Sequence, residues 1–572
     1  MTKRLEGDGI GVDAGVGRRR RGFWRDEDGS FIIFGLAIFM MMIYAGGLGV
    51  DVMRYEAHRT KVQNTLDRAI LAAAALDQTL DPETVVLDYF ARAGLGDIIT
   101  ADDIEWTASD TERKVEASLN LRMGTTFLRM GNLQYLVFPA AGGAEEAASL
   151  SEISLVLDVS GSMDWASHTG YSKLHELKKA AKTFVNLMLC NPEGSDEDGF
   201  DWTIEPDPAT CTTDWGKISI NLVPYAEQVL VGEDFLTRMQ ATAEHDQSSC
   251  VTFSPDDFSS IAVNVAPTME SERMQRTAHF DPVRGRNDNP SDGNAPCRDD
   301  SWREITFLED DYRDLFDEID DLQASGNTSI DLGMKWGAAL LDDSFQDIAS
   351  DLEDEDLIFE GYGERPFSFD KRGIEKVIVL MTDGENTEQD YLKDGYHSGP
   401  SGVFYNPDDD DRISIYDPVA DNYYWVWNGE RHDHAYGDGE FEECRWVGFW
   451  IWGRWECSLV DEGDGAVELT FPGLWDNFTV SWYEQWAFTD DHVNQVYDYS
   501  EKNDHLEAMC DAAKNEGIIV FTIGFEVPGD DQDDIMRACA TFPTYYYDVD
   551  GLNIQTAFES IAREISKLKL IY

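Results

Sequence analysis

Positively charged residues are scarce in this 572-residue chain, which has 45 Lys and Arg residues against 111 Asp and Glu residues and a net charge of −66. Such a chain repels a polyphosphate unless its few bases form a patch. The bases gather only at the start, where residues 1–25 hold seven of them beside three acids. We therefore expect no binding to nucleic acid, and a boundary in the chain near residue 25.

Motifs of the common enzyme classes are missing. The sequence contains no G-x-S-x-G, no H-E-x-x-H, no phosphate-binding loop and no dinucleotide fingerprint. It also lacks C-x-x-C pairs, which excludes the usual ligand spacing of a zinc site. We therefore predict that the chain is not an enzyme.

Cysteine is absent from the first 189 residues, and all eight cysteines follow later. This distribution is typical of a compartment that permits disulfides. Eight cysteines allow 105 connectivities, so spacing alone leaves the pairing open. The hypothesis adopted is that sequence neighbours pair: Cys190 with Cys211, Cys250 with Cys297, Cys444 with Cys457, and Cys510 with Cys539.

Charge is missing altogether from the 20 residues Phe31 to Val50. As a helix this run spans about 30 Å, enough to cross the hydrocarbon core of a membrane. Five arginines lie between residues 18 and 25, and positive charge stays on the cytoplasmic side. We therefore expect a cytoplasmic amino terminus and an exported remainder. A cleaved signal peptide is the alternative, since Ala45 and Gly47 loosely fit a cleavage site.

The sequence after the span changes its period. Apolar residues recur at three- and four-residue steps from Val52 to Ala73, which predicts a continuing helix. From residue 101 the period becomes two, as in Val115, Ala117 and Leu119, which predicts half-buried antiparallel strands. The expected parts are a cytoplasmic basic segment 1–30, a transmembrane helix 31–50, a helical stalk 51–100, a small β-rich module with a linker 101–150, and a main domain 151–572.

Strands and helices alternate in the main domain. The strands ISLVLD, IEKVIVLMTD and IIVFTIGF are continuously apolar, which is typical of a parallel sheet covered on both faces. We therefore predict an α/β fold with a doubly wound, mostly parallel sheet. Two acidic and weakly periodic stretches, at about 190–305 and 386–500, interrupt the alternation and are interpreted as long insertions.

Oxygen-bearing side chains cluster where these strands are expected to end. Asp158, Ser160 and Ser162 follow the first strand, Asp383 follows a later one, and Thr328 precedes a helix between them. Open α/β sheets bind ligands at such turns. Carboxylate and hydroxyl oxygens suit Mg²⁺, with Mn²⁺ or Ca²⁺ as alternatives, and do not suit zinc. The alternative is that the serines only cap the next helix, but three such turns in order favour a metal site.

The motifs DVSGSM, SGNTS and MTDGEN resemble the metal-ion-dependent adhesion site of von Willebrand factor type A domains. In that family these positions hold one divalent cation, and a protein partner completes its coordination, usually with a carboxylate. The resemblance implies a metal site at Asp158, Ser160, Ser162, Thr328 and Asp383. The long separation between Asp158 and Thr328 departs from a minimal domain of this kind and is explained by an insertion.

The chain also resembles TadG-type proteins of tight-adherence (Flp) pilus assembly. The resemblance is carried by DGS before the apolar run, GVD and LDRA after it, and FTIGF and TYYYDVD near the end. Phe34 stands where pseudopilin members have Glu, which argues against incorporation as a pilin subunit. The resemblance implies an inner-membrane protein with a periplasmic or cell-surface domain that binds pilus-assembly components. A surface adhesin that binds host or matrix ligands through the same ion is the alternative function.

Three further patterns are interpreted as structural. Nine of the sixteen tryptophans lie between Trp425 and Trp486. We expect them to form the core of an insertion around the Cys444–Cys457 bridge, although exposed aromatic residues could also contact sugars or a partner. His432 and His434 are expected to be solvated, and the aspartates at 288–292 and 408–411 lack the register of a calcium loop.

Overall fold

The computed structural model describes residues 28–568 apart from 76–77, 79, 109–111, 148–149, 191–202, 204–210, 212, 214–215, 283–289, 291–293, 449–451, 464, 489–492 and 528–529. Residues 1–27 of the predicted basic segment 1–30 lie outside this range. The chain divides into two compact units, residues 1–148 and 149–572, which are described separately.

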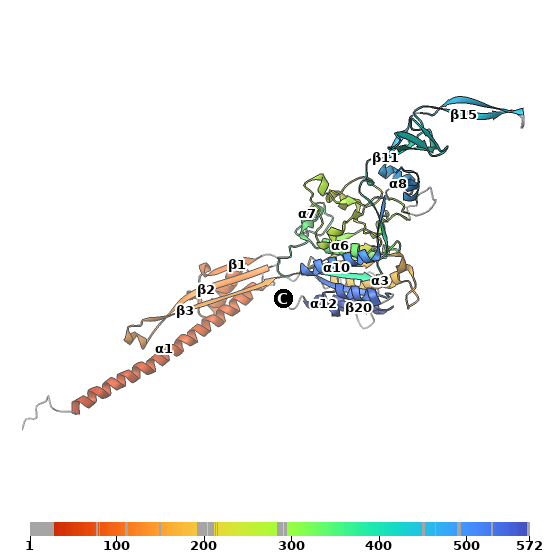
Figure 1. The fold of residues 1–572 in the computed structure, drawn as a ribbon. Coiled ribbons are helices and arrows are strands. Elements are labelled where there is room, and N and C mark those ends of the chain that lie inside the picture. The colour runs from red at the N-terminus through yellow and green to blue at the C-terminus, as the bar shows by residue number, and fades with distance from the viewer. Residues whose placement is uncertain are drawn as a thin grey trace, which may run out of the picture. The chain divides into compact units, whose positions relative to one another are not determined.

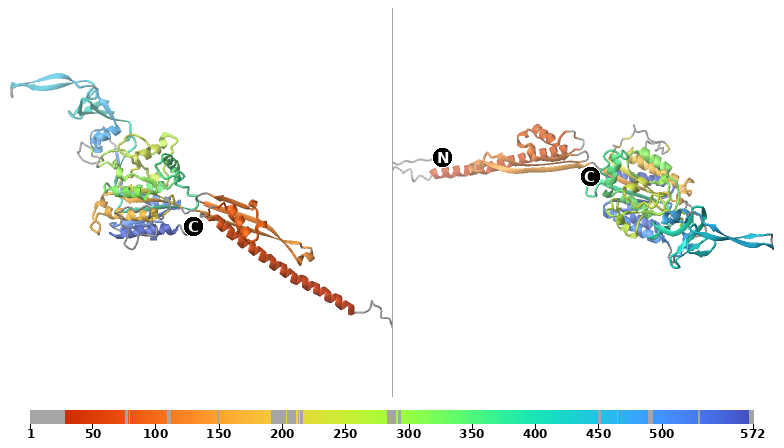
Figure 2. Two further views of the ribbon diagram at one scale, coloured as in Figure 1. Left: turned by 180° about the vertical axis from the view of Figure 1, so that it is seen from behind. Right: turned by 90° about the horizontal axis from the view of Figure 1, so that it is seen from above.

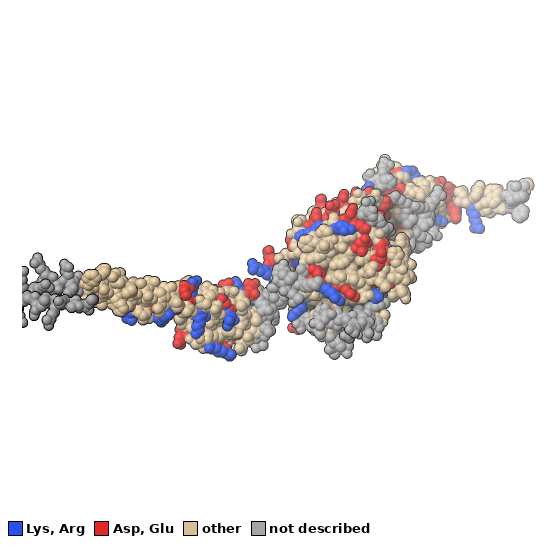
Figure 3. Space-filling view, turned by 90° about the horizontal axis from the view of Figure 1, so that it is seen from below, with Lys and Arg blue, Asp and Glu red and all other residues tan. Residues whose placement is uncertain are grey.

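The first unit contains a helix of 47 residues, α1 (Asp28–Ala74). It is long and apolar enough from Phe31 onward to cross a membrane. Side chains from Phe31 to Val50 are almost all exposed, whereas Val62, Leu66 and Ile70 are buried. Figure 3 shows that the exposed end carries no Lys, Arg, Asp or Glu on the face in view. The two halves of α1 are therefore adapted to different surroundings.

The second half of α1 packs on a small antiparallel sheet of order β1-β2-β3. Val115, Ala117 and Leu119 of β2 are buried and alternate with exposed residues, as the period of two predicts. Figures 1 and 2 show the β2–β3 hairpin lying along α1. The elements of this sheet and its second helix are α2 (Pro82–Arg92), β1 (Ile104–Ala108), β2 (Glu112–Gly124) and β3 (Tyr135–Ala147).

The second unit is built on a six-stranded sheet of order β20-β19-β9-β4-β5-β8. Every pairing is parallel except that of β8 with β5. This order confirms the predicted doubly wound, mostly parallel sheet. The strands are β4 (Leu150–Asp158), β5 (Ile218–Tyr225), β8 (Thr306–Glu309), β9 (Ile374–Thr382), β19 (Ile519–Phe525) and β20 (Tyr546–Val549).

Helices cover both faces of this sheet because its strands are apolar on both sides. All nine residues of β4 are buried. One face packs against α3 (Lys173–Leu189), α5 (Tyr312–Asp321) and α12 (Asn553–Leu568). The other packs against α6 (Ile330–Ala339), α7 (Gln346–Asp354), α10 (Tyr499–Asn515) and α11 (Asp530–Cys539).

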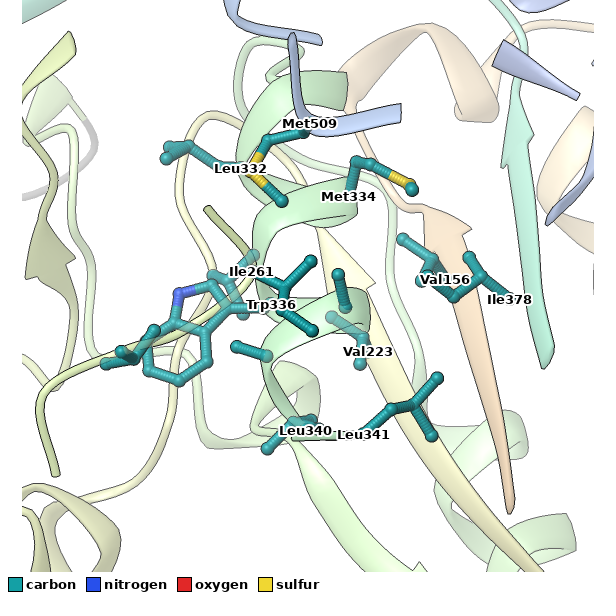
Figure 4. Packing of buried hydrophobic residues seen from close by; sticks show 14 of the residues in the cluster. Val156, Val223, Ile261, Leu332, Met334, Trp336, Leu340, Leu341, Ile378 and Met509 are labelled. Carbon is teal, nitrogen blue, oxygen red and sulfur yellow. The ribbon is translucent and has the colours of Figure 1, made fainter. Parts of the chain in front are cut away.

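Helix α6 lies close to the sheet. A Cβ on Gly337 would come within 2.5 Å of the Val156 side chain, so glycine allows the helix backbone to approach β4. Trp336 of the same helix is buried among Ile261, Leu340 and neighbouring apolar side chains (Figure 4). The carboxyl end of β4 and the start of α6 are thereby held in fixed positions.

Four disulfides join the cysteines as sequence neighbours, which confirms the predicted pairing. The predicted bounds of the first insertion, about 190–305, are wrong, because β5 of the main sheet lies inside them. Apart from β5, this stretch contains α4 (Glu233–Arg238), β6 (Val251–Thr252) and β7 (Gln275–Arg276). The second contains the pair β10 (Gln389–Leu392) and β18 (Asn494–Tyr497), then β11 (Pro400–Asn406), β12 (Asp409–Asp417), β13 (Asn422–Trp425), β14 (Glu430–His432), β15 (Glu440–Val447), β16 (Arg454–Asp461), β17 (Val467–Thr470), α8 (Phe471–Asn477) and α9 (Val480–Trp486).

The second insertion has a core, but only part of the tryptophan group belongs to it. Trp425, Trp475 and Trp482 are buried, whereas Trp427, Trp446, Trp452 and Trp455 are exposed. Trp475 is buried in a cluster that also contains Phe280, from the stretch of the first insertion. Trp425 is buried against the rings of His432 and Tyr436. The expected position of the disulfide is wrong, because Cys444 and Cys457 are exposed. They pair across β15 and β16, which form an isolated two-stranded arm (Figure 1). Two strands alone leave both faces of the arm in solvent.

Candidate metal centre

The first loop of the candidate site follows the central strand β4. The last residue of β4, Asp158, is fully buried. One carboxylate oxygen accepts a hydrogen bond from the backbone N–H of Ser160 at 2.8 Å, and the other accepts one from the Thr382 hydroxyl at 2.9 Å. Because Thr382 ends the neighbouring strand β9, these bonds hold Asp158 between the two strand ends.

The two serines connect this loop to the third one. The hydroxyls of Ser160 and Ser162 are 3.0 Å apart, and Ser162 donates a hydrogen bond of 2.6 Å to Asp383 Oδ1. The second oxygen of Asp383 lies 3.0 Å from the ammonium group of Lys173, the first residue of α3. One oxygen of Asp383 therefore bonds to the serine loop, while the other pairs with the ammonium group of Lys173.

The second loop reaches the site through a glycine contact. Gly326 has a φ of +85°, which favours glycine, and its carbonyl accepts a hydrogen bond of 2.9 Å from Gly161 N. A Cβ on Gly161 would lie 3.2 Å from that carbonyl oxygen, so the approach is close. Two residues later Thr328 stands just before α6, and its backbone N–H donates to Thr387 Oγ1 at 2.9 Å.

Ser162, Thr328 and Asp383 line one cavity of about 840 Å³ at the carboxyl ends of the strands. Asp158 and Ser160 are buried directly behind them, joined by the hydrogen bonds above. The structure therefore brings together all five residues that the sequence singled out. Ser160 accepts no N-cap hydrogen bond for the short helix that follows it, which argues against a purely capping role.

A buried lysine supports the second loop from behind. Lys502 of α10 donates hydrogen bonds to the carbonyl oxygens of Thr328 (3.0 Å) and Thr387 (2.9 Å), and to the Ser329 hydroxyl (2.5 Å). Burial lowers the pKa of Lys502 to about 8. Sequence reasoning missed Lys502 and Lys173 because neither belongs to a local motif, and only tertiary contact places them here.

The electrostatics of the site suit a divalent cation. Burial, and then the charge of nearby Asp383, raise the pKa of Asp158 to about 7. Two carboxylates this close repel each other, and a cation between them removes that repulsion. The donors are all hard oxygens, which fit Mg²⁺, Mn²⁺ or Ca²⁺. Bound there, such an ion would be held by two carboxylates and three neutral hydroxyls and would remain attractive to a further anionic oxygen.

The rim of the cavity is acidic and carries one large aromatic side chain. Glu385, Glu526 and Asp550 line it, and Trp165 is 68% exposed beside them. His168 Nδ1 lies 3.6 Å from Glu526 Oε1 and 3.9 Å from Asp550 Oδ1. A surface that enters this cavity meets these side chains.

The expectation that His432 and His434 are solvated is wrong, because both make contacts within the second insertion. His432 stacks on Trp425 with ring centroids 3.4 Å apart. His434 bonds through one ring nitrogen to Glu462 (3.0 Å) and through the other to Asp433 (2.7 Å). These contacts occupy both nitrogens of His434. Asp288 and Asp292 lie outside the described residues, as do the side chains of residues 409–411.

Comparison with known families gives a match, at residues 29–76, to the family described as putative Flp pilus-assembly TadE/G-like. The amino-terminal segment of the chain is TadE/G-like. The match covers the apolar run and the buried half of α1, which are the residues that carried the resemblance at this end. Comparison with curated protein sequences gives no match.

Solved structures with detectable similarity include three pilus proteins. The von Willebrand factor domain of the type V pili tip protein Mfa5 from Porphyromonas gingivalis is 14% identical over 74% of this chain and 96% of its own, with a TM-score of 0.29. The pilus adhesin SpaC from Lactobacillus rhamnosus GG is 12% identical over 81% of this chain and 34% of its own (TM-score 0.29). The minor pilin PilB from Streptococcus sanguinis is 12% identical over 82% and 79% (TM-score 0.27).

Proposed function

We propose that this protein is a membrane-anchored, exported binding module of tight-adherence (Flp) pilus assembly. In this proposal α1 crosses the inner membrane at residues 31–50, residues 1–30 are cytoplasmic, and the domain from residue 151 is periplasmic or on the cell surface. The observation that carries it is the combination, in one chain, of a TadE/G-like apolar helix and five oxygen-bearing side chains that meet at one edge of the main sheet.

The proposed binding step uses one divalent cation, Mg²⁺ by preference. Asp158 and Asp383 supply its only two protein carboxylates, and Ser160, Ser162 and Thr328 supply neutral hydroxyls. The two carboxylates only balance the charge of the ion, and the hydroxyls add no negative charge, so a carboxylate from a partner can complete its coordination. A binding role without catalysis is part of the proposal, because the sequence lacks hydrolase and nucleotide-binding motifs.

The acidic residues around the cavity restrict which partner surfaces can bind there. A carboxylate that approaches Glu385, Glu526 and Asp550 is repelled unless basic side chains accompany it. We therefore propose that the partner presents its acidic residue among bases, and that these bases contact the rim. Trp165 is positioned to pack on the same surface.

Metal binding is tested by calorimetric titration of the purified full chain with Mn²⁺. Asp158→Asn removes a charged ligand, and we expect its affinity to fall more than about tenfold, equivalent to about 1.4 kcal/mol. Ser160→Ala and Thr328→Ala should weaken binding by less. Asp164→Asn is the matched control, since Asp164 is exposed in the same loop and the charge change is identical. Equal affinities of the wild type and Asp158→Asn would contradict a metal site here.

Partner binding is tested by co-purification of pilus-assembly proteins from envelope extracts. The wild type and Asp164→Asn should retain them in Mg²⁺ and lose them in chelator, whereas Asp158→Asn should fail in both. Equal recovery by the wild type and Asp158→Asn in chelator would refute the metal bridge even if the metal binds.

A further inference from the structure

The β2–β3 hairpin of the first unit lies along α1 in a fixed register. Near its base, Gln63 of α1 donates to the carbonyl of Ala141 at 3.0 Å. Farther along, Phe138 contacts Tyr55 edge to face, with ring centroids 5.5 Å apart. The hairpin therefore runs toward the apolar end of α1 (Figures 1 and 2). Its turn meets the helix at Asp51.

Asp51 fastens the turn to the helix. Its buried carboxylate accepts hydrogen bonds from the backbone N–H groups of Thr126 (3.0 Å), Phe127 (2.7 Å) and Leu128 (2.8 Å). These N–H groups lie at the start of a short 3₁₀ turn, Leu128–Gly131. The first N–H groups of a helical turn have no hydrogen-bond acceptor within the turn, and the Asp51 carboxylate supplies one. Asp51 is also the first charged residue after the apolar run.

Below Asp51 the turn contacts helix residues that belong to the apolar run itself. A Cβ on Gly47 would collide with the Phe127 side chain, and a Cβ on Gly131 would collide with the Tyr44 hydroxyl. At 1.5 Å per residue, Gly47 and Tyr44 lie about 5 Å and 9 Å inside the end of the run at Val50. The turn therefore extends past the end of the run, to the depth of the membrane boundary.

Apolar side chains are exposed at this end of the hairpin, interspersed with the exposed polar residues Arg129, Asn132 and Gln134. Met130, Leu133, Tyr135 and Val137 are between 45% and 58% exposed. The guanidinium group of Arg122 lies 5.1 Å from the centre of the Tyr135 ring. Tyr with Arg beside exposed aliphatic side chains is typical of a membrane–water interface, where rings and basic groups lie at the headgroups.

We propose that this turn inserts into the outer face of the membrane that α1 crosses, and that it forms a second, monotopic contact with the lipid. The bilayer is the occupant because the apolar surface of the turn is continuous with the apolar run of α1. The depth of about 5–9 Å agrees with that of helices lying in an interface. This inference rests on the membrane anchoring proposed above.

The depth of the turn is measured with the full chain reconstituted in vesicles of phosphatidylethanolamine and phosphatidylglycerol. Met130→Cys is labelled with the environment-sensitive fluorophore NBD, and quenching is compared for nitroxide lipids and for aqueous iodide. We expect strong quenching by a lipid whose nitroxide lies near the headgroups, and weak quenching by iodide. The same label at Asp97→Cys, an exposed position farther along the unit, should respond only to iodide.

Two glycines provide a matched pair. Gly47→Ala places a methyl group against Phe127 and should displace the turn, so that lipid quenching of the label at position 130 falls several-fold. In Gly49→Ala no atom of the described residues lies within 4 Å of the new methyl group outside the helix itself, so quenching should stay unchanged. A thiol count without reductant checks that the native disulfides are intact in each variant.

Three results would overturn the inference. Iodide quenching of the label at position 130 equal to that at position 97 would place the turn in water. Protection from both quenchers, with energy transfer between labelled copies, would mean that a second copy covers the turn. Equal effects of the two glycine variants would remove the link to α1. A label at Ile38→Cys separates these from failure of the anchor, because it reports lipid only if α1 spans the membrane.

Discussion

Lys173 and a metal ion at the proposed site would share the carboxylate of Asp383. The ammonium group lies 3.0 Å from Asp383 Oδ2, whereas Oδ1 faces Ser162. Lys173 therefore neutralises Asp383 when no metal is bound, and it lowers the attraction of the site for a cation. The lysine sets the balance between stability without metal and affinity for metal.

Lys173→Met should separate these two effects. Without metal, we expect a loss of about 3 kcal/mol in unfolding free energy, because a buried carboxylate loses its cation. With Mn²⁺ the affinity should increase, since one competing positive charge is gone. Thermal unfolding with and without Mn²⁺ measures both, and Lys179→Met on the same helix is the control. A lower Mn²⁺ affinity of Lys173→Met would contradict the competition.

His434 should make the second insertion more stable in acid than in base. Burial opposes its charge, but hydrogen bonds to Glu462 and Asp433 prevail and raise its pKa above 6.5. The ion pair therefore contributes fully below about pH 6.5 and is lost as the pH rises through the raised pKa. The melting temperature of His434→Gln should fall below that of the wild type at about pH 5.5 by more than at about pH 8.5. A difference that does not change with pH would contradict this.

At the scale of elements, the four disulfides stabilise different parts of the chain. Cys510 and Cys539 are buried between α10 and α11, whereas Cys444 and Cys457 are exposed on the β15–β16 arm. The first pair ties helices to the main sheet. The second holds together two strands that would be marginal alone.

Replacing each pair by serine should therefore give different results. Loss of Cys510–Cys539, 29 residues apart, should lower the global unfolding free energy by about 3–4 kcal/mol. Loss of Cys444–Cys457 should speed hydrogen exchange in the arm and leave the melting temperature of the main sheet unchanged. Equal shifts of the global transition would show that the arm is part of the same cooperative unit.

The elements also show what could be predicted from the sequence. Asp158 and Asp383 end continuously apolar runs, so their meeting at one sheet edge follows from the parallel order. The disulfide pairs followed from sequence proximity. The contacts of Lys502 and Asp51 could not be predicted, because each joins segments more than 70 residues apart without a local signature. The exposed arm was not predicted. A run of tryptophans predicts a buried core, and the sequence does not show that β15 and β16 pair only with each other.

At the scale of the whole molecule, the net charge of −66 makes stability depend on ionic strength. Salt screens the repulsion among surface carboxylates, so the melting temperature should rise with NaCl. MgCl₂ at equal ionic strength should raise it further in the wild type and in Asp164→Asn, but Asp158→Asn should lose most of that excess. An excess that survives in Asp158→Asn would indicate general screening by the divalent ion.

The central position of β4 has a mechanical consequence. The strand begins directly after the first unit and ends at Asp158, and it pairs along its length with β5 on one side and β9 on the other. A pull between the membrane anchor and a partner held at the metal would therefore act along the axis of this strand. The backbone hydrogen bonds to both neighbours would be loaded in shear, and they would have to break together rather than one after another. The force would therefore be resisted by the central strands of the main sheet, β4, β5 and β9.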